Sequence, residues 1–359
     1  MTITRRGFLG VSAAALVARP KAAATGTLYI GTYTSPVGGG SGIGIATYDV
    51  NGKITATGVL TGVEDPSFLV TSGQFLYAVN EQADGGVTAI SIDAPDNLRI
   101  LNRQPNKGSA PCHLTTVGNY LLSANYGSGD LAVHPIQADG SLGQQTDLVE
   151  HEGASPHAHQ VLQVGEYIVA VDLGTDSIYT YTLADGKLTL RYRTTLKAGA
   201  GPRHLAFHPS GHFAYVANEL DSTITVCRYD DGQFTPLSTL STIPPGAPQN
   251  FPGEVIASAD GRSVYLTNRG HNSIAVFTVV DQGAAISLTS TPSCGGDWPR
   301  HCTLDPTGSL MFVSNQRSNN ITTFAVDRST GGLTETSSFS TPMRPASVFD
   351  SARPFAFLS

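Results

Sequence analysis

The sequence predicts an all-β fold, a seven-bladed β-propeller whose ring closes by pairing N-terminal strands with the C-terminal strand. Seven prolines, each followed by a short apolar strand pattern, stand 45, 45, 46, 50, 47 and 46 residues apart. A period near 45 residues with four strand signals per unit is typical of propeller blades. Long helical patterns are missing, while 39 glycines and 21 prolines suit a fold with many tight turns. The prolines are Pro66, Pro111, Pro156, Pro202, Pro252, Pro299 and Pro345.

The unit that starts at Pro202 shows the expected order of strands. A first strand follows this proline, the chain turns at 209–211, and a second strand returns through 213–217. Gly211 ends the turn, because glycine readily adopts the positive φ that such a hairpin needs. The run 222–226 predicts a third strand, and a less regular segment before the next proline predicts a fourth.

The last unit needs a hairpin partner from elsewhere in the chain. Pro345 begins an innermost strand that ends near Phe349, with almost no sequence after it. The segments 29–33 and 44–48 have strand patterns and would supply the missing second and third strands. We therefore expect both ends of the chain to complete one blade, which removes exposed sheet edges from the ring.

Residues 1–24 are predicted to be a Tat-type signal peptide, and residues 25–359 a single propeller domain. Arg5 and Arg6 precede an apolar, alanine-rich run, and small residues at 22–24 end the segment. This order is typical of a twin-arginine export signal; the alternative is a chance basic start before a short helix. The apolar run is shorter than the ~20 residues that span a bilayer. We expect a periplasmic or secreted protein, a monomer or weak oligomer, with no membrane association after cleavage.

Removing the leader makes the chain more acidic. Residues 1–24 hold four basic residues and no acidic ones, so the net charge of −7 becomes −7 − 4 = −11. Such an anionic body argues against nucleic-acid and anionic-membrane partners. An anionic ligand would have to be held by local arginines, which makes arginines in the channel informative. The four basic residues of the leader are Arg5, Arg6, Arg19 and Lys21.

Four cysteines remain after the leader, none of them in a Cys-x-x-Cys pair. A zinc site built on thiolates is therefore not expected. In an oxidising compartment Cys294 and Cys302 could close a small loop as a disulfide. Spacing alone does not establish the geometry of that bond, so free thiols are the alternative.

Polar side chains are expected to gather at one rim of the channel. The first strand of each blade lines the axis, and its antiparallel partner returns to the same rim. Arg203, Glu219 and Arg269 carry charges that most units lack, which favours a functional site, whereas the recurring Asn residues suit strand-end caps. His204 and His301 recur at a framework position and suit hydrogen bonds between blades. The first-strand set is His113, His159, His204, Glu254 and His301, with Arg203 and Arg300 beside two of them; the second-strand set is Glu81, Tyr126, Asp172, Glu219, Arg269 and Gln316.

Several short motifs resemble the seven-bladed lactonase family, which contains the 6-phosphogluconolactonase-type propellers and the fungal carboxymuconate lactonizing enzyme. They are His-Ala-His at 157–159, Gly-Pro-Arg-His at 201–204, Asn-Glu-Leu at 218–220 and Thr-Asn-Arg at 267–269. The segments 28–34 and 65–69 are similar to the family as well, so the resemblance covers residues 28 to 350.

The resemblance implies a catalytic set of one histidine, two arginines and one glutamate, without a metal or cofactor. His157 lies two residues from His159, and a one-residue gap would exchange them; we favour His159, which we align with His204. The implied catalytic residues are His159, Arg203, Glu219 and Arg269, and the residues expected to bind substrate are His157, His204, His113, Glu81 and Arg300.

The implied reaction is hydrolysis of a small-molecule lactone. The arginines would hold an anionic substituent and polarise the lactone carbonyl. His159 or Glu219 would activate water and return the proton to the ring oxygen. Export conflicts with a phosphorylated sugar lactone, which is a cytosolic metabolite, so an unphosphorylated aldonolactone is the alternative substrate.

Two other classes of function remain open. A calcium-dependent propeller hydrolase of the gluconolactonase or paraoxonase kind would use oxygen ligands near the channel, although an arginine-rich rim repels a dication. A non-catalytic scaffold that binds peptides on one face is the second alternative. The oxygen ligands that would serve calcium are Glu81, Asn125, Asp172 and Glu254.

Overall fold

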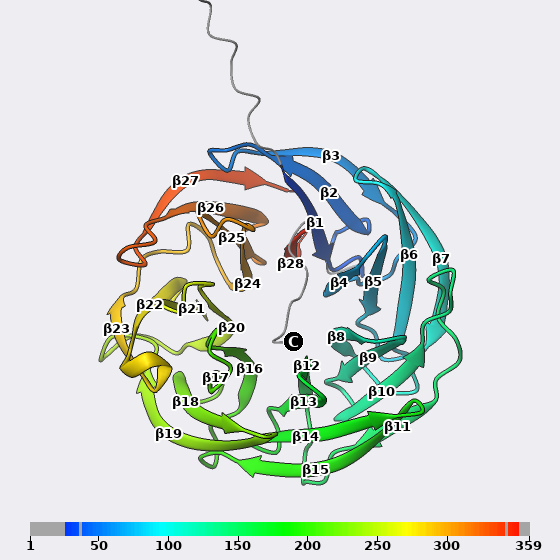
Figure 1. Cartoon of the computed structure of the whole chain (residues 1–359). Coiled ribbons are helices and arrows are strands. Elements are labelled where there is room, and N and C mark those ends of the chain that lie inside the picture. The colour runs from blue at the N-terminus through cyan, green and yellow to red at the C-terminus, as the bar shows by residue number, and fades with distance from the viewer. Residues whose placement is uncertain (1–25, 36–37, 342–343, 352–359) are drawn as a thin grey trace, which may run out of the picture.

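The computed structural model describes residues 26–35, 38–341 and 344–351. These residues form seven four-stranded antiparallel sheets arranged as blades around one axis (Figure 1). The predicted signal peptide lies outside the described residues. Among the described residues no helix is both long and apolar enough to cross a bilayer; their helical structure is the short 3₁₀ turn η1 (Asp281–Gly283).

In six blades the strands run from the axis to the outer edge in chain order, as predicted, and in the closing blade the last strand of the chain is innermost. The innermost strands are β4 (Leu69–Ser72), β8 (Pro111–Val117), β12 (Ala158–Val164), β16 (Pro202–Phe207), β20 (Phe251–Ala257), β24 (Pro299–Leu304) and β28 (Pro345–Asp350). The second strands are β5 (Phe75–Asn80), β9 (Tyr120–Asn125), β13 (Tyr167–Asp172), β17 (Phe213–Asn218), β21 (Ser263–Arg269), β25 (Leu310–Asn315) and β1 (Gly26–Thr32).

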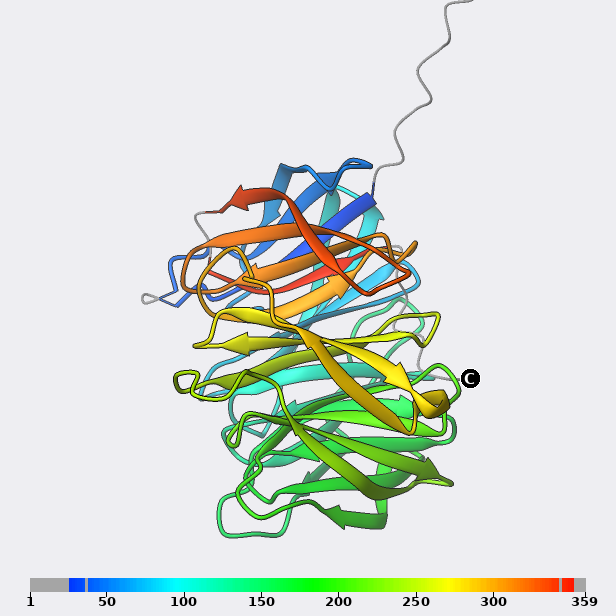
Figure 2. The ribbon, with the colours of Figure 1, turned by 90° about the vertical axis from the view of Figure 1, so that its left-hand side faces the viewer.

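The third and fourth strands form the outer half of each blade, and Figure 2 shows the ring edge-on. The third strands are β6 (Gly86–Ala94), β10 (Asp130–Pro135), β14 (Ser177–Ala184), β18 (Thr223–Asp230), β22 (Ser273–Val280), β26 (Asn320–Val326) and β2 (Ile43–Tyr48). The fourth strands are β7 (Asn97–Pro105), β11 (Asp147–Glu150), β15 (Lys187–Thr195), β19 (Gln233–Ser241), β23 (Ala285–Ser290), β27 (Leu333–Ser340) and β3 (Ile54–Leu60).

The ring closes through a sheet built from both ends of the chain, which confirms the prediction. β28 pairs with β1, and the sheet continues outward through β2 and β3. Tyr29 lies opposite Phe349 and Leu28 opposite Asp350 in this antiparallel pair. The Tyr48 hydroxyl donates a hydrogen bond to Asp350, joining residues that are 302 positions apart. This closure holds the innermost strands in one ring, and therefore fixes the channel that they enclose.

The core lies between neighbouring blades, where the apolar faces of adjacent sheets pack together. Leu122 and Val133 of one blade contact a cluster that includes Val161 and Ile168 of the next. Because successive strand residues point to opposite faces, each blade buries both of its faces against its neighbours. The predicted glycine turns have the expected backbone: Gly211 has a φ of 76° and donates its N–H to the carbonyl of His208.

Candidate active site

A β-bulge near the start of the innermost strands places the channel side chains. In β16 the pairing with β17 skips one residue, because Pro202 lies opposite Asn218 and His204 opposite Ala217. Arg203 is the extra residue of this bulge. A bulge residue is left out of the ladder and its side chain is aimed away from the regular sheet faces, a device common beside active sites. Equivalent bulge residues in other blades are Cys112, His159, Gly253, Arg300 and Ala346.

The register of the third blade corrects one sequence alignment. In β12, Ala158 lies opposite Asp172 and Gln160 opposite Val171, so His159 is the bulge residue. His159 therefore occupies the position of Arg203, and Gln160 occupies the position of His204. The predicted alignment of His159 with His204 is wrong, because the innermost strand begins two residues after its proline in this blade and at the proline itself in the next. His159 still reaches the channel, but through the bulge.

Asp172 is likewise one position away from its predicted place at the rim. It ends β13 where Asn218 ends β17, and Leu173 takes the rim position, donating its N–H to the carbonyl of His157. The Asp172 carboxylate is buried and lies 2.6 Å from His151 Nδ1. It also accepts the backbone N–H groups of His157 and Thr175, at 3.0 and 2.8 Å. Asp172 thus holds the loop before β12 in place and does not line the site.

Glu219 joins two arginines from neighbouring blades. Its Oε2 lies 3.3 Å from Arg203 Nε and 2.6 Å from Arg269 Nη2. Both guanidinium groups also donate to backbone carbonyls. Arg203 Nη1 donates to the carbonyl of Gly253, at 2.8 Å, and Arg269 donates to the carbonyls of Phe251 and Pro252, at 3.0 Å each. Gly253 leaves this space open, since a Cβ there would lie 2.6 Å from Thr267 Oγ1. The predicted meeting of these charges at the channel is confirmed.

The two arginines are almost fully buried, with 2% of Arg203 and 4% of Arg269 exposed. Burial and the nearby Arg269 and Arg300 lower the pKa of Arg203 below its usual value, and burial also lowers the pKa of Arg269. The Glu219 side chain is more open, with 18% exposed. Arg203 Nε has an ion-pair contact with Glu219 but no aligned hydrogen bond. The cluster therefore carries two cations on one anion and retains an N–H donor, which suits an anionic or polarised oxygen.

Arg300 and Glu81 form a second charged group across the ring closure. Arg300 Nη2 lies 3.7 Å from Glu81 Oε2, which also accepts hydrogen bonds from the Tyr33 hydroxyl, at 2.8 Å, and from the Ser67 hydroxyl. The Arg300 guanidinium lies 5.7 Å from the centroid of the Tyr33 ring. Sequence reasoning missed Tyr33, which follows β1, and Ser67, which precedes β4, because their contacts with Glu81 form only in the tertiary structure. These hydroxyls and the carboxylate are suited to binding a polyhydroxylated ligand.

Histidines from two other blades contact Glu254 near the axis. His204 Nδ1 lies 3.0 Å from both carboxylate oxygens of Glu254, and His301 Nε2 lies 3.5 Å from Oε2. Phe68 packs 4.0 Å from His113, measured between ring centroids. These contacts confirm hydrogen bonding between blades for His204. A small pocket joins this group to the arginines and is lined by Ser67, Phe68, Cys112, Arg203, His204, Glu254, Arg300, His301 and Ala346.

His159 and His157 have different environments. His159 Nδ1 lies 3.1 Å from His204 Nε2, and 5% of the residue is exposed. Burial, followed by the charge of Arg203, holds the pKa of His159 well below the usual histidine value, so its imidazole is neutral at pH 7. His157 instead stacks on Tyr126 with ring centroids 4.5 Å apart, and its Nδ1 donates to the Tyr126 carbonyl at 2.8 Å. Its Nε2 lies 3.1 Å from the Ser155 hydroxyl.

Trp298 is a rim residue that sequence reasoning did not select. It precedes Pro299 with a φ of 65°, a left-handed backbone that bulky residues rarely adopt. Arg317 covers its ring with the guanidinium carbon 3.4 Å from the centroid, and Arg269 lies at 5.7 Å. Asp65, Ala110 and Gly201 also have positive φ before their prolines. The repeated proline marks this position in the sequence. It does not indicate that the residue before it is a strained aromatic residue beside Arg269.

The groups suggested for calcium lie in separate networks. Asn125 Nδ2 donates to Asp130, Asp172 pairs with His151, and Glu254 pairs with His204. Within residues 26–35, 38–341 and 344–351, no group of three or more His, Cys, Asp or Glu side chains is arranged to hold a metal ion. The suggested disulfide is not formed, since the Cys294 thiol is free and its Sγ donates to the carbonyl of Gly296.

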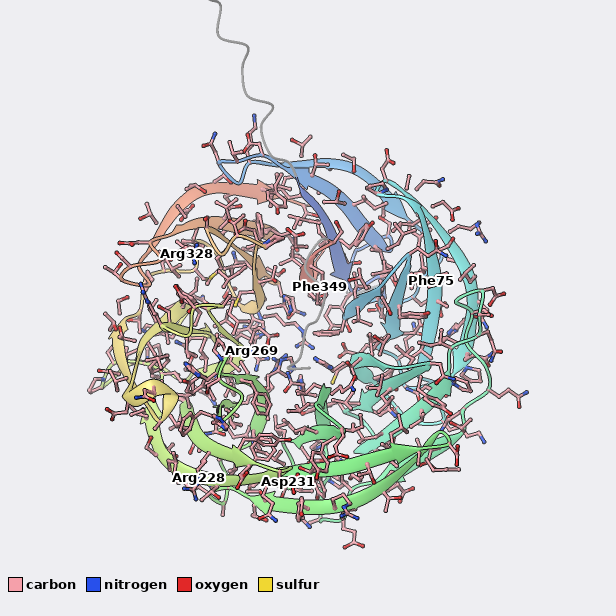
Figure 3. All side chains as sticks on the ribbon, viewed as in Figure 1. Phe75, Arg228, Asp231, Arg269, Arg328 and Phe349 are labelled. Atoms are coloured by element: carbon pink, nitrogen blue, oxygen red, sulfur yellow. The ribbon has the colours of Figure 1, made fainter. Side chains whose placement is uncertain are left out.

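Figure 3 shows Arg269 directed toward the channel together with Phe349, whereas Arg228, Asp231 and Arg328 lie near the outer circumference. The fold and this cluster define a closed seven-bladed propeller with a charged, histidine-rich site on its axis. The sequence model of the family described as "Lactonase, 7-bladed beta-propeller" matches residues 27–349. The chain belongs to this lactonase family.

Relatives from three organisms agree with this assignment. A 6-phosphogluconolactonase of Bacillus subtilis (strain 168) is 38% identical over 326 residues, which are 85% of this chain and 93% of that protein. A solved protein from Lactobacillus plantarum is 33% identical, with a TM-score of 0.86 and coverage of 91% and 99%. The periplasmic gluconolactonase of Pseudomonas aeruginosa is 27% identical, with a TM-score of 0.86 and coverage of 92% and 100%. These similarities support a lactone hydrolase function.

Proposed function

We propose that the protein opens a sugar-type lactone to its hydroxy acid, with Arg203, Glu219, Arg269 and His159 as the catalytic residues. The observation that carries the proposal is the convergence of two buried arginines on Glu219, beside a neutral histidine. Hydrolysis of a lactone needs a polarised carbonyl and an activated water. The cluster supplies a group for each task.

Arg203 and Arg269 polarise the carbonyl and stabilise the oxyanion that forms when water adds to it. Fixed donors in a site that excludes water stabilise such a charge strongly. Glu219 pairs with both guanidinium groups, and the carbonyls of 251–253 hold them from the other side. Glu219 therefore orients the arginines, and the role of base falls to His159.

His159 acts as the general base. Its neutral imidazole accepts a proton from water as the water oxygen bonds to the carbonyl carbon. The tetrahedral intermediate then collapses, the bond between that carbon and the ring oxygen breaks, and the imidazolium returns the proton to the leaving oxygen. One water is consumed, and the products are a carboxylate and a hydroxyl on a single molecule, with the carboxylic proton released.

Substrate hydroxyls are bound on the opposite side of the channel. Glu81 accepts hydrogen bonds and Arg300 donates them, while Tyr33 and Ser67 support Glu81. His204 lines the pocket, His113 packs against Phe68 of the same pocket, and His157 stacks on Tyr126. A polyol chain can satisfy this mixed set of donors and acceptors, which favours an aldonolactone.

The proposed location is the periplasm or the medium, after Tat-dependent export. Support comes from the twin-arginine segment and from the similarity to a protein described as a periplasmic gluconolactonase. An exported enzyme meets unphosphorylated sugar lactones, so we propose these as substrates ahead of phosphorylated ones. We propose that the mature protein is a monomer or weak oligomer.

The test is a hydrolysis screen of the mature protein with phosphorylated and unphosphorylated sugar lactones, corrected for spontaneous opening. We expect turnover of an unphosphorylated aldonolactone that is insensitive to chelator, and its loss in Arg203→Ala with an unchanged melting temperature. Turnover that disappears with chelator and returns with calcium would favour the calcium-dependent class. Absence of turnover across the panel, with the protein folded, would favour a binding scaffold.

A further inference from the structure

A continuous chain of hydrogen bonds links a buried carboxylate to the proposed base. Glu254 lies 3.0 Å from His204 Nδ1, and His204 Nε2 lies 3.1 Å from His159 Nδ1. The three residues come from three consecutive blades: Glu254 from β20, His204 from β16 and His159 from β12. All three are buried, with exposed fractions of 6%, 2% and 5% in that order. Such a chain is costly to bury unless every member is satisfied.

The backbone around Glu254 determines which atoms carry protons. The Val348 N–H points at His301 Nδ1 at 3.4 Å, so His301 carries its proton on Nε2 and directs it toward Glu254 Oε2 at 3.5 Å. The Val255 N–H donates to Glu254 Oε1 at 3.2 Å. Donors thus reach both oxygens of Glu254, which is what a carboxylate accepts and a carboxylic acid cannot fully use.

The protonation of the two remaining histidines follows from this carboxylate. His204 must carry a proton on Nδ1 to donate to Glu254, so its Nε2 has a lone pair. His159 must then donate from Nδ1 to that lone pair, which leaves the lone pair of His159 on Nε2. Among the described residues His159 Nε2 has no hydrogen-bond partner, so the series of hydrogen bonds that starts at Glu254 ends at this nitrogen.

We propose that Glu254 and His204 are positioning residues that fix His159 with its basic nitrogen, Nε2, toward the channel. The carboxylate stabilises the imidazolium that forms when His159 takes a proton, because two consecutive hydrogen bonds of 3.0 and 3.1 Å connect the two charges. His204 transmits this effect and does not touch the reacting atoms. The role of His204 is then different from the substrate contact expected from sequence.

The charges around His159 set the background against which this effect operates. Burial and the arginines lower the pKa of His159, and burial raises the pKa of Glu254, while His301 and Arg203 lower it. The carboxylate at the far end therefore opposes the arginines. The titratable and charged groups that surround His159 are Cys112, Tyr126, Arg203, His204, Arg269 and Arg300.

The first test reads the protons directly and is independent of turnover. Long-range proton–nitrogen NMR spectra of the ¹⁵N-histidine-labelled protein distinguish the two neutral forms of an imidazole, and His159→Asn assigns the signal. We expect His159 to be protonated on Nδ1 and unprotonated on Nε2. The reverse form, with the proton on Nε2, would mean that Glu254 is neutral and would overturn the proposal.

The second test uses variants that interrupt the series of hydrogen bonds from Glu254 to His159 at different residues. In Glu254→Gln the pKa of His159 should fall by about half a unit or more, measured from the same NMR signal, because the negative charge is lost. His204→Gln retains an acceptor for His159 but loses the link to Glu254, so the pKa should fall equally while the Nδ1 proton stays. His204→Asn removes that acceptor and should change the protonated nitrogen. An unchanged pKa in both Glu254→Gln and His204→Gln would contradict the proposal.

The kinetic arm rests on the proposed lactone hydrolysis. In Glu254→Gln, kcat should fall about tenfold or more with KM nearly constant, and the acid limb of the rate should move to lower pH. The matched control is His134→Gln, which replaces a fully buried histidine on β10 away from the channel and should leave both the limb and the rate unchanged. If the pKa of His159 shifts in the NMR experiment but no lactone is turned over, the positioning role of Glu254 and His204 is confirmed and the proposed function is wrong. If Glu254→Gln lowers the rate but leaves the acid limb of the pH–rate profile and the pKa of His159 unchanged, the role of Glu254 is purely structural.

Discussion

Arg269 Nη2 lies 2.6 Å from Glu219 Oε2, although the arginine ends β21 and the glutamate follows β17 in the neighbouring blade. The same oxygen lies 3.3 Å from Arg203 Nε. One carboxylate therefore sets the spacing of two guanidinium groups, which neither strand could do alone.

Loss of Arg269 should remove transition-state stabilisation without unfolding the blade. We expect Arg269→Ala to lower kcat/KM by 10²-fold or more, the range found when one donor to an oxyanion is deleted. Lactone hydrolysis corrected for the spontaneous rate measures it. Arg317→Ala is the control, because it also contacts Trp298 but forms no ion pair with Glu219. An Arg269→Ala enzyme as fast as the control would contradict this role.

Gly253→Ala should act through the position of Arg203. The added Cβ would lie 2.6 Å from Thr267 Oγ1 and 3.1 Å from the carbonyl of Arg300. The bulge must therefore shift and move the carbonyl that accepts from Arg203. We expect kcat/KM to fall at least tenfold while the melting temperature drops by only a few degrees.

Gly58→Ala is the matched control for this substitution, since its Cβ would be 3.7 Å from Ile45 at the outer strand β3. Its activity should equal that of the wild type. Equal activity of both glycine variants would mean that the carbonyl of Gly253 does not position Arg203 for the reaction.

Asp172→Asn should destabilise the fold. The substitution leaves His151 without its carboxylate at 2.6 Å in a site where neither side chain is exposed. Breaking a buried pair typically costs about 3–5 kcal/mol, so we expect the free energy of unfolding to fall by about 3 kcal/mol in urea titrations. Asp221→Asn breaks the exposed pair with Lys197 and should cost at most about 1 kcal/mol. Comparable losses in the two variants would contradict the prediction.

The buried histidines should make the fold sensitive to acid. Burial lowers the pKa of His301 to about 4, against about 6.5 in an unfolded chain. Between these values the unfolded chain binds a proton that the native protein excludes. The contribution of the neutral His301 to the free energy of unfolding is therefore complete above pH 6.5. It is lost as the pH falls toward 4, which lowers the free energy of unfolding by about 3 kcal/mol. Glu254 acts in the opposite direction, because its raised pKa favours the native state at low pH.

Urea unfolding at pH 7 and pH 5 tests this prediction. The wild type should lose stability at the lower pH, and His301→Asn should lose measurably less between the two. An equal or greater loss in His301→Asn would show that His301 is not excluded from protonation in the native state.

Trp298 should report ligand binding by fluorescence. It is the only tryptophan of the chain, and the guanidinium groups of Arg317 and Arg269 lie 3.4 and 5.7 Å from its ring. A lactone that engages Arg269 changes the charge beside the indole. We expect a saturable change in emission when His159→Asn, which binds without turnover, is titrated with the substrate. Constant emission at concentrations well above KM would place the ligand elsewhere.

Much of this architecture could be predicted from local patterns. The spacing of seven prolines follows from blade size, and the apolar strand patterns at 29–33 and near Phe349 required the closing sheet. The charges of Arg203, Glu219 and Arg269 stand out against a repeating framework, and the hairpin geometry requires them to meet at one rim.

The place of His159 could not be predicted, because a one-residue offset leaves the pattern of apolar residues readable in two registers. Only the pairing of Ala158 with Asp172 resolves it, since hydrogen bonds between strands depend on backbone that lies far apart in sequence. Tyr33 and Trp298 escaped selection for a related reason, since their contacts form across the ring closure and between blades.

The sequence by itself determined the number of blades, the closure of the ring and the rim on which lone charges gather, because these depend on repeat length and strand direction. The tertiary structure decided which side chain occupies each bulge, which carboxylate pairs with which cation and how Glu254 reaches His159. Those outcomes depend on distances of a few ångströms between blades, and no local pattern of residues encodes them.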